Sequence, residues 1–236
     1  MKKKLRWMIP LALIICLLAA FLIYTGNYYH ADAAALAALE TDDAVAVTRT
    51  GYGWFFDGPS EDDVLVFYPG GKVEETAYAP MLRLLAEQGM DVCLVKMPFR
   101  LAVFGANRAE DVLAAVDHEN RYVGGHSLGG AMAADYAAGH SAELRGVILF
   151  AAYPTKALDS DLLLLSIYGS EDGVLNLDKV AAGRQFAPTK YLEQVIDGGN
   201  HAQFGNYGVQ KGDGAASISR QDQQTQTAAL ILQAIR

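Results

Sequence analysis

The most informative segment of the chain is RYVGGHSLGGAMAADYAAGH, residues 121–140. It opens with a short apolar run that predicts a strand and closes with an Ala-rich run that predicts a helix. Between them, Gly125-His126-Ser127-Leu128-Gly129 has the Gly-x-Ser-x-Gly spacing that holds a serine on a tight strand-to-helix turn. The N–H groups and positive dipole end of the following helix favour an oxyanion there. The segment therefore predicts Ser127 as a nucleophile. A Gly-rich turn with Ser127 as a helix N-cap is the alternative.

Short apolar runs alternate with amphipathic stretches on both sides of this segment. The runs predict strands at 45–48, 52–56, 64–68, 91–97, 121–125, 146–153, 162–169 and 191–197, the first two as paired edge strands. The amphipathic stretches predict helices at 76–88, 108–118, 127–140, 177–187 and 224–236. This alternation is typical of an α/β fold with a mainly parallel, doubly wound sheet flanked by helices. In such sheets the functional groups gather at the carboxyl ends of the strands.

The N-terminus carries an uncharged apolar run of 18 residues, 7–24, preceded by Lys2, Lys3, Lys4 and Arg6. At about 1.5 Å per residue, a helix of this length crosses the roughly 30 Å of hydrocarbon in a bilayer. The basic flank holds its end in the cytoplasm, so the rest of the chain is expected outside. A small-residue cleavage site occurs only at 31–33, well beyond the run. We therefore expect a single-pass anchor in the cell membrane, with secretion after signal cleavage as the alternative.

The apolar run divides the chain into four parts. Residues 1–6 are the cytoplasmic basic flank, 7–24 the transmembrane or signal segment, 25–43 a short helical stalk, and 44–236 the folded domain. Cys16 lies in the apolar run and Cys93 in a predicted buried strand, so the two are not expected to pair. An exported domain without a disulfide must rely on its core.

The charge of the chain excludes nucleic acid as an expected partner. The 236 residues include 19 Lys and Arg and 27 Asp and Glu, a net charge of −8. Beyond the four cations at the N-terminus, the chain carries 15 basic and 27 acidic residues, a net charge of −12. Nucleic-acid binding depends mainly on cations that neutralise phosphates, and this domain lacks such an excess.

A serine nucleophile needs an imidazole to accept its proton, and His201 is the best placed of the five histidines. It lies in a Gly-rich loop directly after the predicted strand 191–197. Surface roles account for His30, His118 and His140, and the tight turn is expected to aim His126 away from the nucleophile. His201 is therefore the expected base, although a hydrogen bond within its own loop is an alternative role.

The carboxylate that orients this histidine is expected to be Asp172. It follows the strand 162–169 and stands between Ser127 and His201, the chain order that this architecture requires. Glu171 is adjacent and could serve instead if the loop is offset by one residue. Other acids near strand ends are Asp159, Asp161 and Asp197. Capping of the helix that begins near Leu177 is the alternative role for Asp172.

The oxyanion is expected to be held by the backbone N–H groups of Leu128 and Gly71. The residue after the nucleophile normally supplies one donor, and Gly71 lies in the loop Tyr68-Pro69-Gly70-Gly71-Lys72, where glycines allow a close approach to substrate. A plain Pro-Gly-Gly turn is the alternative for this loop. Four apolar residues after the next strand are candidate walls of an acyl pocket: Met97, Pro98, Phe99 and Phe104.

From about Val64 to its end, the chain resembles the alpha/beta-hydrolase superfamily, most closely the small, lidless hydrolases near the dienelactone hydrolases and carboxylesterases. The resemblance implies Ser127 as nucleophile, Asp172 as orienting acid, His201 as base, and Gly71 and Leu128 as oxyanion donors. Tyr68-Pro69 replaces the His-Gly pair common in the superfamily, and dienelactone hydrolases carry cysteine where this chain has Ser127. Only residues 154–161 stand where many relatives insert a cap domain, so an open site is expected.

These residues predict a serine hydrolase that cleaves a carboxylic ester or related acyl bond of a small molecule through an acyl-enzyme. No metal or organic cofactor is expected. Two alternatives are transfer of the acyl group to a cell-envelope acceptor and a non-catalytic binding domain with the same fold. The glycine-rich stretch 205–219 is either a border of the site or a mobile surface loop.

Overall fold

The computed structural model describes residues 2–60 and 62–236. The strands are β1 Ala46–Arg49, β2 Gly53–Asp57, β3 Asp63–Tyr68, β4 Met90–Val95, β5 Asn120–His126, β6 Gly146–Phe150, β7 Leu163–Gly169 and β8 Lys190–Ile196. The α-helices are α1 Lys2–Gly26, α2 Ala33–Ala37, α3 Ala79–Ala86, α4 Arg108–Leu113, α5 Leu128–Ala137, α6 Leu177–Gly183 and α7 Arg220–Ile235. Short 3-10 turns include η1 Glu75–Tyr78, η2 Pro98–Arg100 and η3 Ala102–Phe104.

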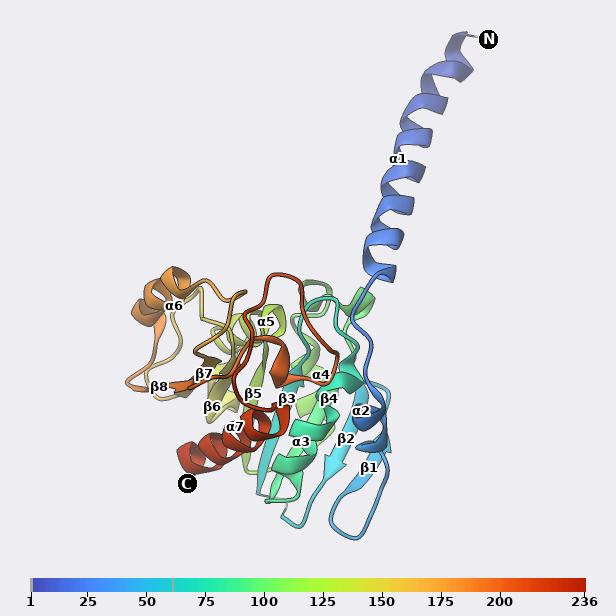
Figure 1. Ribbon diagram of the computed structural model, residues 1–236. Coiled ribbons are helices and arrows are strands. Elements are labelled where there is room, and N and C mark those ends of the chain that lie inside the picture. The colour runs from blue at the N-terminus through green and yellow to red at the C-terminus, as the bar shows by residue number, and fades with distance from the viewer. Residues whose placement is uncertain (1, 61) are drawn as a thin grey trace.

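The strands form one sheet in the order β1-β2-β4-β3-β5-β6-β7-β8, with helices on both faces (Figure 1). β1 and β2 form the predicted pair at one edge of the sheet, and they run antiparallel; β2 is also antiparallel to β4. All pairings from β4 to β8 are parallel. The predicted α/β fold with a mainly parallel, doubly wound sheet is therefore confirmed.

Apolar side chains on both faces of the sheet explain why helices cover each face. Along β3, Leu65 and Phe67 pack in the core beneath α3 and α7, whereas Val64 and Val66 pack in the core beneath α4 and α5. These four side chains are fully buried. A strand covered on both faces needs such a continuous apolar run, because successive side chains point to opposite sides.

The helix predicted at 108–118 is shorter than expected. α4 ends at Leu113, and the next residues turn toward β5. His118 Nε2 lies 3.0 Å from Asp91 Oδ2, and the Arg121 guanidinium donates to the His118 carbonyl. The contact with Asp91 on β4 is a tertiary one that helical periodicity does not report, and it outweighs the local preference for helix.

The segment expected as a stalk, 25–43, lies against the domain. Tyr29 pairs with Val73 as an isolated parallel bridge, and Ala35 of the short helix α2 is completely buried. Asp32 caps α2 by accepting a hydrogen bond from Ala35 N, and its backbone N–H donates to the carbonyl of Asn206. Only residues 27 and 28 separate the end of α1 from the Tyr29 bridge.

Candidate active site

Ser127 lies on a strained turn between β5 and α5. Its backbone has φ 52° and ψ −121°, a left-handed conformation that a residue with a side chain adopts only under constraint. The constraint comes from close packing: a Cβ on Gly129 would lie 2.2 Å from the carbonyl oxygen of Tyr68. Only glycine fits there, so β3 and the start of α5 can approach closely enough to hold the turn. The predicted strand, turn and helix around Ser127 are all present.

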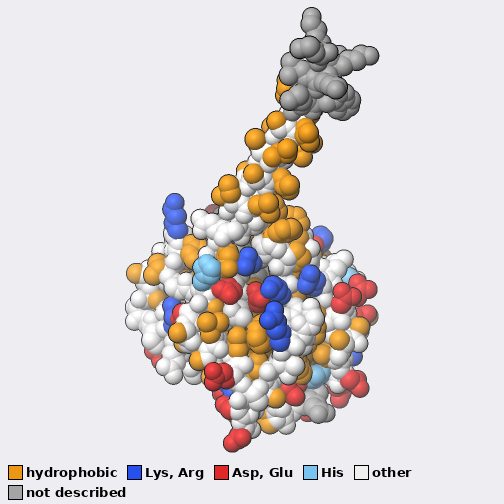
Figure 2. Space-filling model, turned by 90° about the vertical axis from the view of Figure 1, so that its right-hand side faces the viewer, with side chains coloured by type: hydrophobic (Ala, Val, Ile, Leu, Met, Phe, Trp, Pro, Cys, Tyr) orange, Lys and Arg blue, Asp and Glu red, His pale blue; other side chains and the backbone are white. Residues whose placement is uncertain are grey.

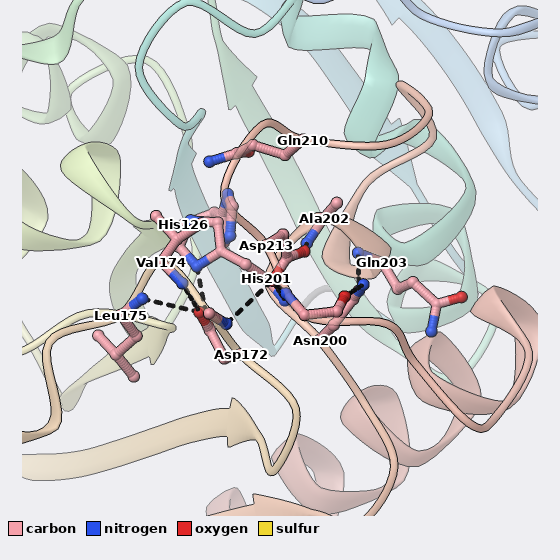
Figure 3. Close-up of polar contacts among 12 residues, drawn as sticks. His126, Asp172, Val174, Leu175, Asn200, His201, Ala202, Gln203, Gln210 and Asp213 are labelled. Carbon is pink, nitrogen blue, oxygen red and sulfur yellow. Dashed lines mark hydrogen bonds and ion pairs between the residues drawn. The ribbon is translucent and has the colours of Figure 1, made fainter.

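His201 and Asp172 form a buried pair at the same edge of the sheet (Figure 3). His201 Nδ1 lies 2.8 Å from Asp172 Oδ2, and each side chain is 1% exposed. The other oxygen, Asp172 Oδ1, accepts hydrogen bonds from the backbone N–H groups of Val174 and Leu175. A carboxylate held in this way accepts the Nδ1 proton and leaves Nε2 as the basic nitrogen.

Ser127 and His201 line one pocket of about 270 Å³. The other lining residues are Leu128, Ala131, Ala151, Ala152, Tyr153, Val174, Leu175 and Asn176. No hydrogen bond joins the side chains of Ser127 and His201, and among the described residues His201 Nε2 has no hydrogen-bond partner. Catalytic hydrogen bonds of this kind often tighten only when substrate is bound. The pocket thus brings a serine and the free nitrogen of an oriented histidine to one cavity.

The two expected oxyanion donors lie beside each other. A Cβ on Gly71 would lie 3.0 Å from Leu128 Cδ2, so the loop after β3 touches the residue that follows Ser127. Within the described residues, the backbone N–H groups of Gly71 and Leu128 donate to no backbone acceptor. Both donors are therefore available to a ligand.

The pocket walls differ from those expected from the sequence. Met97 is buried in the core on the α4 and α5 side, and Phe99 and Phe104 are exposed beside α1. The walls come instead from the segments after β6 and β7, including Ala152 and Val174. The prediction that Met97, Pro98, Phe99 and Phe104 wall this pocket is wrong: none of the four lines it, because Met97 packs in the core and the η2 and η3 turns place Phe99 and Phe104 against α1.

His126 packs against the base His201, a contact that the sequence did not predict. Its ring centroid lies 4.4 Å from that of His201, so the turn that points it away from Ser127 places it against the base. The Tyr78 hydroxyl accepts a hydrogen bond from the Gly70 N–H and is hydrogen-bonded to His126 Nδ1 at 2.8 Å. Burial, with a further contribution from His201, holds the pKa of His126 well below its usual value. A neutral His126 does not oppose protonation of His201.

We expect Tyr78→Phe to weaken the fold by about 1–3 kcal/mol, because the Gly70 N–H and His126 Nδ1 would both lose a buried partner. Denaturant unfolding of the full chain measures the change. Tyr122→Phe is the control, since the Tyr122 hydroxyl forms no hydrogen bond that the described residues provide. Equal stability of the two variants would show that the tyrosine does not join the Gly70 loop to the serine turn.

Asp213 is a second missed residue, and it ties the 205–219 stretch to the site (Figure 3). Its carboxylate accepts hydrogen bonds from the backbone N–H groups of Gly173, His201 and Ala202. It therefore joins the loop that carries Asp172 to the loop that carries His201. Of the two roles expected for this stretch, bordering the site is the one that the structure supports. Its only sequence signal was the length of the loop.

Asp213→Ala is expected to lower kcat by about 10–100-fold, because small displacements of a catalytic group have effects of this size. The control is Asp178→Ala, which removes an exposed carboxylate from the first turn of α6. Steady-state kinetics with one soluble ester would compare them. A kcat for Asp213→Ala equal to that of the control would contradict a role in holding the two loops together.

A serine on a strand-to-helix turn, with a histidine and carboxylate from later strand ends of a mainly parallel sheet, defines the α/β class of hydrolases. The similarity of the chain to known proteins agrees with this class. Residues 64–225 match the model of the alpha/beta hydrolase family, so the chain belongs to this family. It is a hydrolase by family. A search of curated proteins gave no match.

Solved structures share the fold. A membrane phospholipase A described as a bacterial virulence factor is 12% identical, with a TM-score of 0.60, 98% of this chain covered and 97% of that one. Esterase 2 from Thermogutta terrifontis, phosphoramylated by tabun, is 14% identical, with a TM-score of 0.57 and coverage of 83% and 96%. Est1E from Butyrivibrio proteoclasticus is 13% identical, with a TM-score of 0.58 and coverage of 82% and 99%. At these identities the likeness concerns the fold.

Among the described residues, no group of three or more His, Cys, Asp or Glu side chains is placed to hold a metal ion. The part of α1 from Ile9 to Gly26 is long and apolar enough to span a membrane, and a signal sequence would have the same properties.

Proposed function

We propose that the chain is a membrane-anchored serine hydrolase that cleaves a carboxylic ester or related acyl bond outside the cytoplasm. The observation that carries the proposal is that His201, paired with Asp172, lines the same pocket as Ser127 on its strained turn. The apolar helix α1 would anchor a catalytic domain of residues 44–236, with the basic flank 1–6 in the cytoplasm.

The geometry supports a two-step mechanism. His201 Nε2 takes the proton from Ser127 as Oγ attacks the acyl carbonyl, and Asp172 stabilises the imidazolium that forms. The N–H groups of Gly71 and Leu128 hold the oxyanion. His201 then gives the proton to the leaving alcohol. Water, activated by the same histidine, releases the acid from the serine ester and restores the free hydroxyl.

Two features of related structures support this chemistry. One protein of similar fold is an esterase described as phosphoramylated by tabun, and another is described as a membrane phospholipase A. The pocket is small and lined mainly by alanine and other apolar side chains, which suit an acyl group better than a charged one.

A series of 4-nitrophenyl esters from acetate to decanoate, given to the full chain in detergent, tests the proposal. We expect release of nitrophenol together with an equal amount of free carboxylic acid. If an added alcohol instead receives most of the acyl groups as a new ester, the enzyme is an acyltransferase. Release no faster than the buffer rate for every ester would contradict catalysis and favour a binding domain.

A further inference from the structure

Exposed apolar side chains gather at the edge of the domain that holds the candidate active site. Beyond α1, nine large hydrophobic side chains are exposed among the described residues. Six of them follow the carboxyl ends of β4, β7 or β8 and are here called the apolar rim: Phe99, Val103, Phe104, Val174, Leu177 and Val209. The other three are Leu36, Leu192 and Val195. The rim therefore lies on the edge of the sheet to which Ser127, Asp172 and His201 also belong.

Helix α1 leaves the domain at this same edge. The Phe21 ring contacts those of Phe99 and Phe104, with centroid distances of 5.1 and 5.8 Å. Figure 1 shows α1 projecting from the end of the domain where α6 also lies. In Figure 2 hydrophobic side chains continue from the helix onto the domain where the two meet. The apolar surface is thus continuous from the membrane-spanning candidate to the part of the rim that holds Phe99 and Phe104.

Aromatic and basic side chains surround this junction. Lys72 Nζ lies 4.2 Å from the centroid of the Tyr24 ring, and the Arg100 guanidinium lies 3.4 Å from that of Tyr28. Tyrosine side chains are enriched at both membrane–water interfaces, and Lys and Arg near the end of a spanning helix extend to the headgroup region. Lys72 directly follows Gly71, so the headgroup region would begin one residue from the proposed oxyanion donor.

The connection between α1 and the domain is too short to hold the two apart. Tyr29 N donates to the Lys72 carbonyl, and Glu74 N donates to the Tyr29 carbonyl, at 2.8 and 2.9 Å. With only residues 27 and 28 between α1 and this bridge, a bilayer that holds α1 lies directly above the apolar rim. Contact with this bilayer accounts for the exposed apolar side chains of the rim without another partner.

We propose that the apolar rim docks on the bilayer that holds α1, and that the pocket takes its substrate from there, as the acyl ester of a membrane-resident lipid. This inference rests on the proposed function. An acyl chain would pass from the bilayer between rim side chains to Ser127, since Val174 belongs to both the rim and the pocket wall. Water-soluble esters would reach the same serine without using the rest of the rim.

The test uses two triple variants of the full chain in vesicles of dioleoylphosphatidylcholine and dioleoylphosphatidylglycerol. The rim variant is Val103→Ser, Leu177→Ser and Val209→Ser, none of which lines the pocket. The control variant, Leu36→Ser, Leu192→Ser and Val195→Ser, removes a similar apolar area away from the rim. Activity is measured on 4-methylumbelliferyl oleate dissolved in the vesicles and on soluble 4-nitrophenyl acetate.

We expect the rim variant to lose at least tenfold in rate on the oleate ester and less than twofold on acetate, whereas the control variant keeps both rates. Equal rates of the two variants on oleate would overturn the proposal. So would a wild-type enzyme that cleaves acetate but not the oleate ester. Failure on both esters by the wild type would instead contradict the proposed function.

Docking is also measured without catalysis. An environment-sensitive fluorophore is attached to Val209→Cys or, as the control, to Val195→Cys, each with Cys16→Ser; Cys93 is buried. In vesicles we expect the emission maximum of the fluorophore at position 209 to lie at shorter wavelength than that at position 195. Position 195 reports the aqueous buffer above the vesicle surface. The same emission maximum at both positions would show that the rim does not enter the bilayer.

Discussion

Replacing Ser127 with alanine is expected to lower kcat on soluble esters by a factor of roughly 10³ to 10⁶, the range found when a catalytic serine is removed. Without Oγ no acyl-enzyme forms, and the remaining groups can only polarise the carbonyl. The fold should be unaffected, because alanine keeps the Cβ and the Ser127 side chain makes no hydrogen bond to a described residue. We expect the free energy of unfolding to change by less than about 0.5 kcal/mol.

The matched control is Ser217→Ala, which removes an exposed hydroxyl from the 205–219 stretch. This variant should keep wild-type kinetics. Residual activity of Ser127→Ala within tenfold of the wild type, with the fold intact, would mean that another group is the nucleophile.

Asp172→Asn is expected to lower kcat by roughly 10³ to 10⁴, the second largest effect. The amide could present its NH₂ group to His201 Nδ1, which would then carry no proton and leave Nε2 protonated and unable to act as a base. The loop should keep its shape, since the amide oxygen can still accept from Val174 N and Leu175 N.

Glu171→Gln is the paired variant, because the sequence leaves open which of the two neighbouring acids orients the histidine. Glu171 is exposed and accepts a hydrogen bond from Ser170 rather than from His201. Its kcat should lie within twofold of the wild type. A larger loss for Glu171→Gln than for Asp172→Asn would contradict the structure at this loop.

The fold could be predicted from the sequence because its main signals are local. The apolar run of β3 requires burial on both faces, and the glycines around Ser127 allow a close approach of the backbone. Both signals are readable without knowing the rest of the chain. Chain order and strand ends likewise led to Asp172 and His201, whose pairing the structure shows. The predicted length of α4 was wrong because His118 contacts Asp91, which is distant in sequence, and the chain leaves the helix before it.

The missed parts of the site depend on tertiary contacts. The carboxylate of Asp213 reaches the site through a loop without periodicity, and no spacing rule relates it to His201. The position of Phe99 depends on a turn with positive φ at that residue, which sends its ring toward α1 rather than the pocket. The direction of such side chains depends on the local backbone dihedral angles, which residue types and their spacing do not predict.

Covalent labelling of the full chain with a fluorophosphonate, followed by mass spectrometry of its peptides, tests most directly whether Ser127 and His201 act together. The reagent phosphonylates a serine only where a base activates the hydroxyl. We predict one adduct, on Ser127, that is absent from Ser127→Ala and strongly slowed in His201→Ala. An adduct on another residue, or unchanged labelling of Ser127→Ala, would contradict the claim that Ser127 and His201 act together.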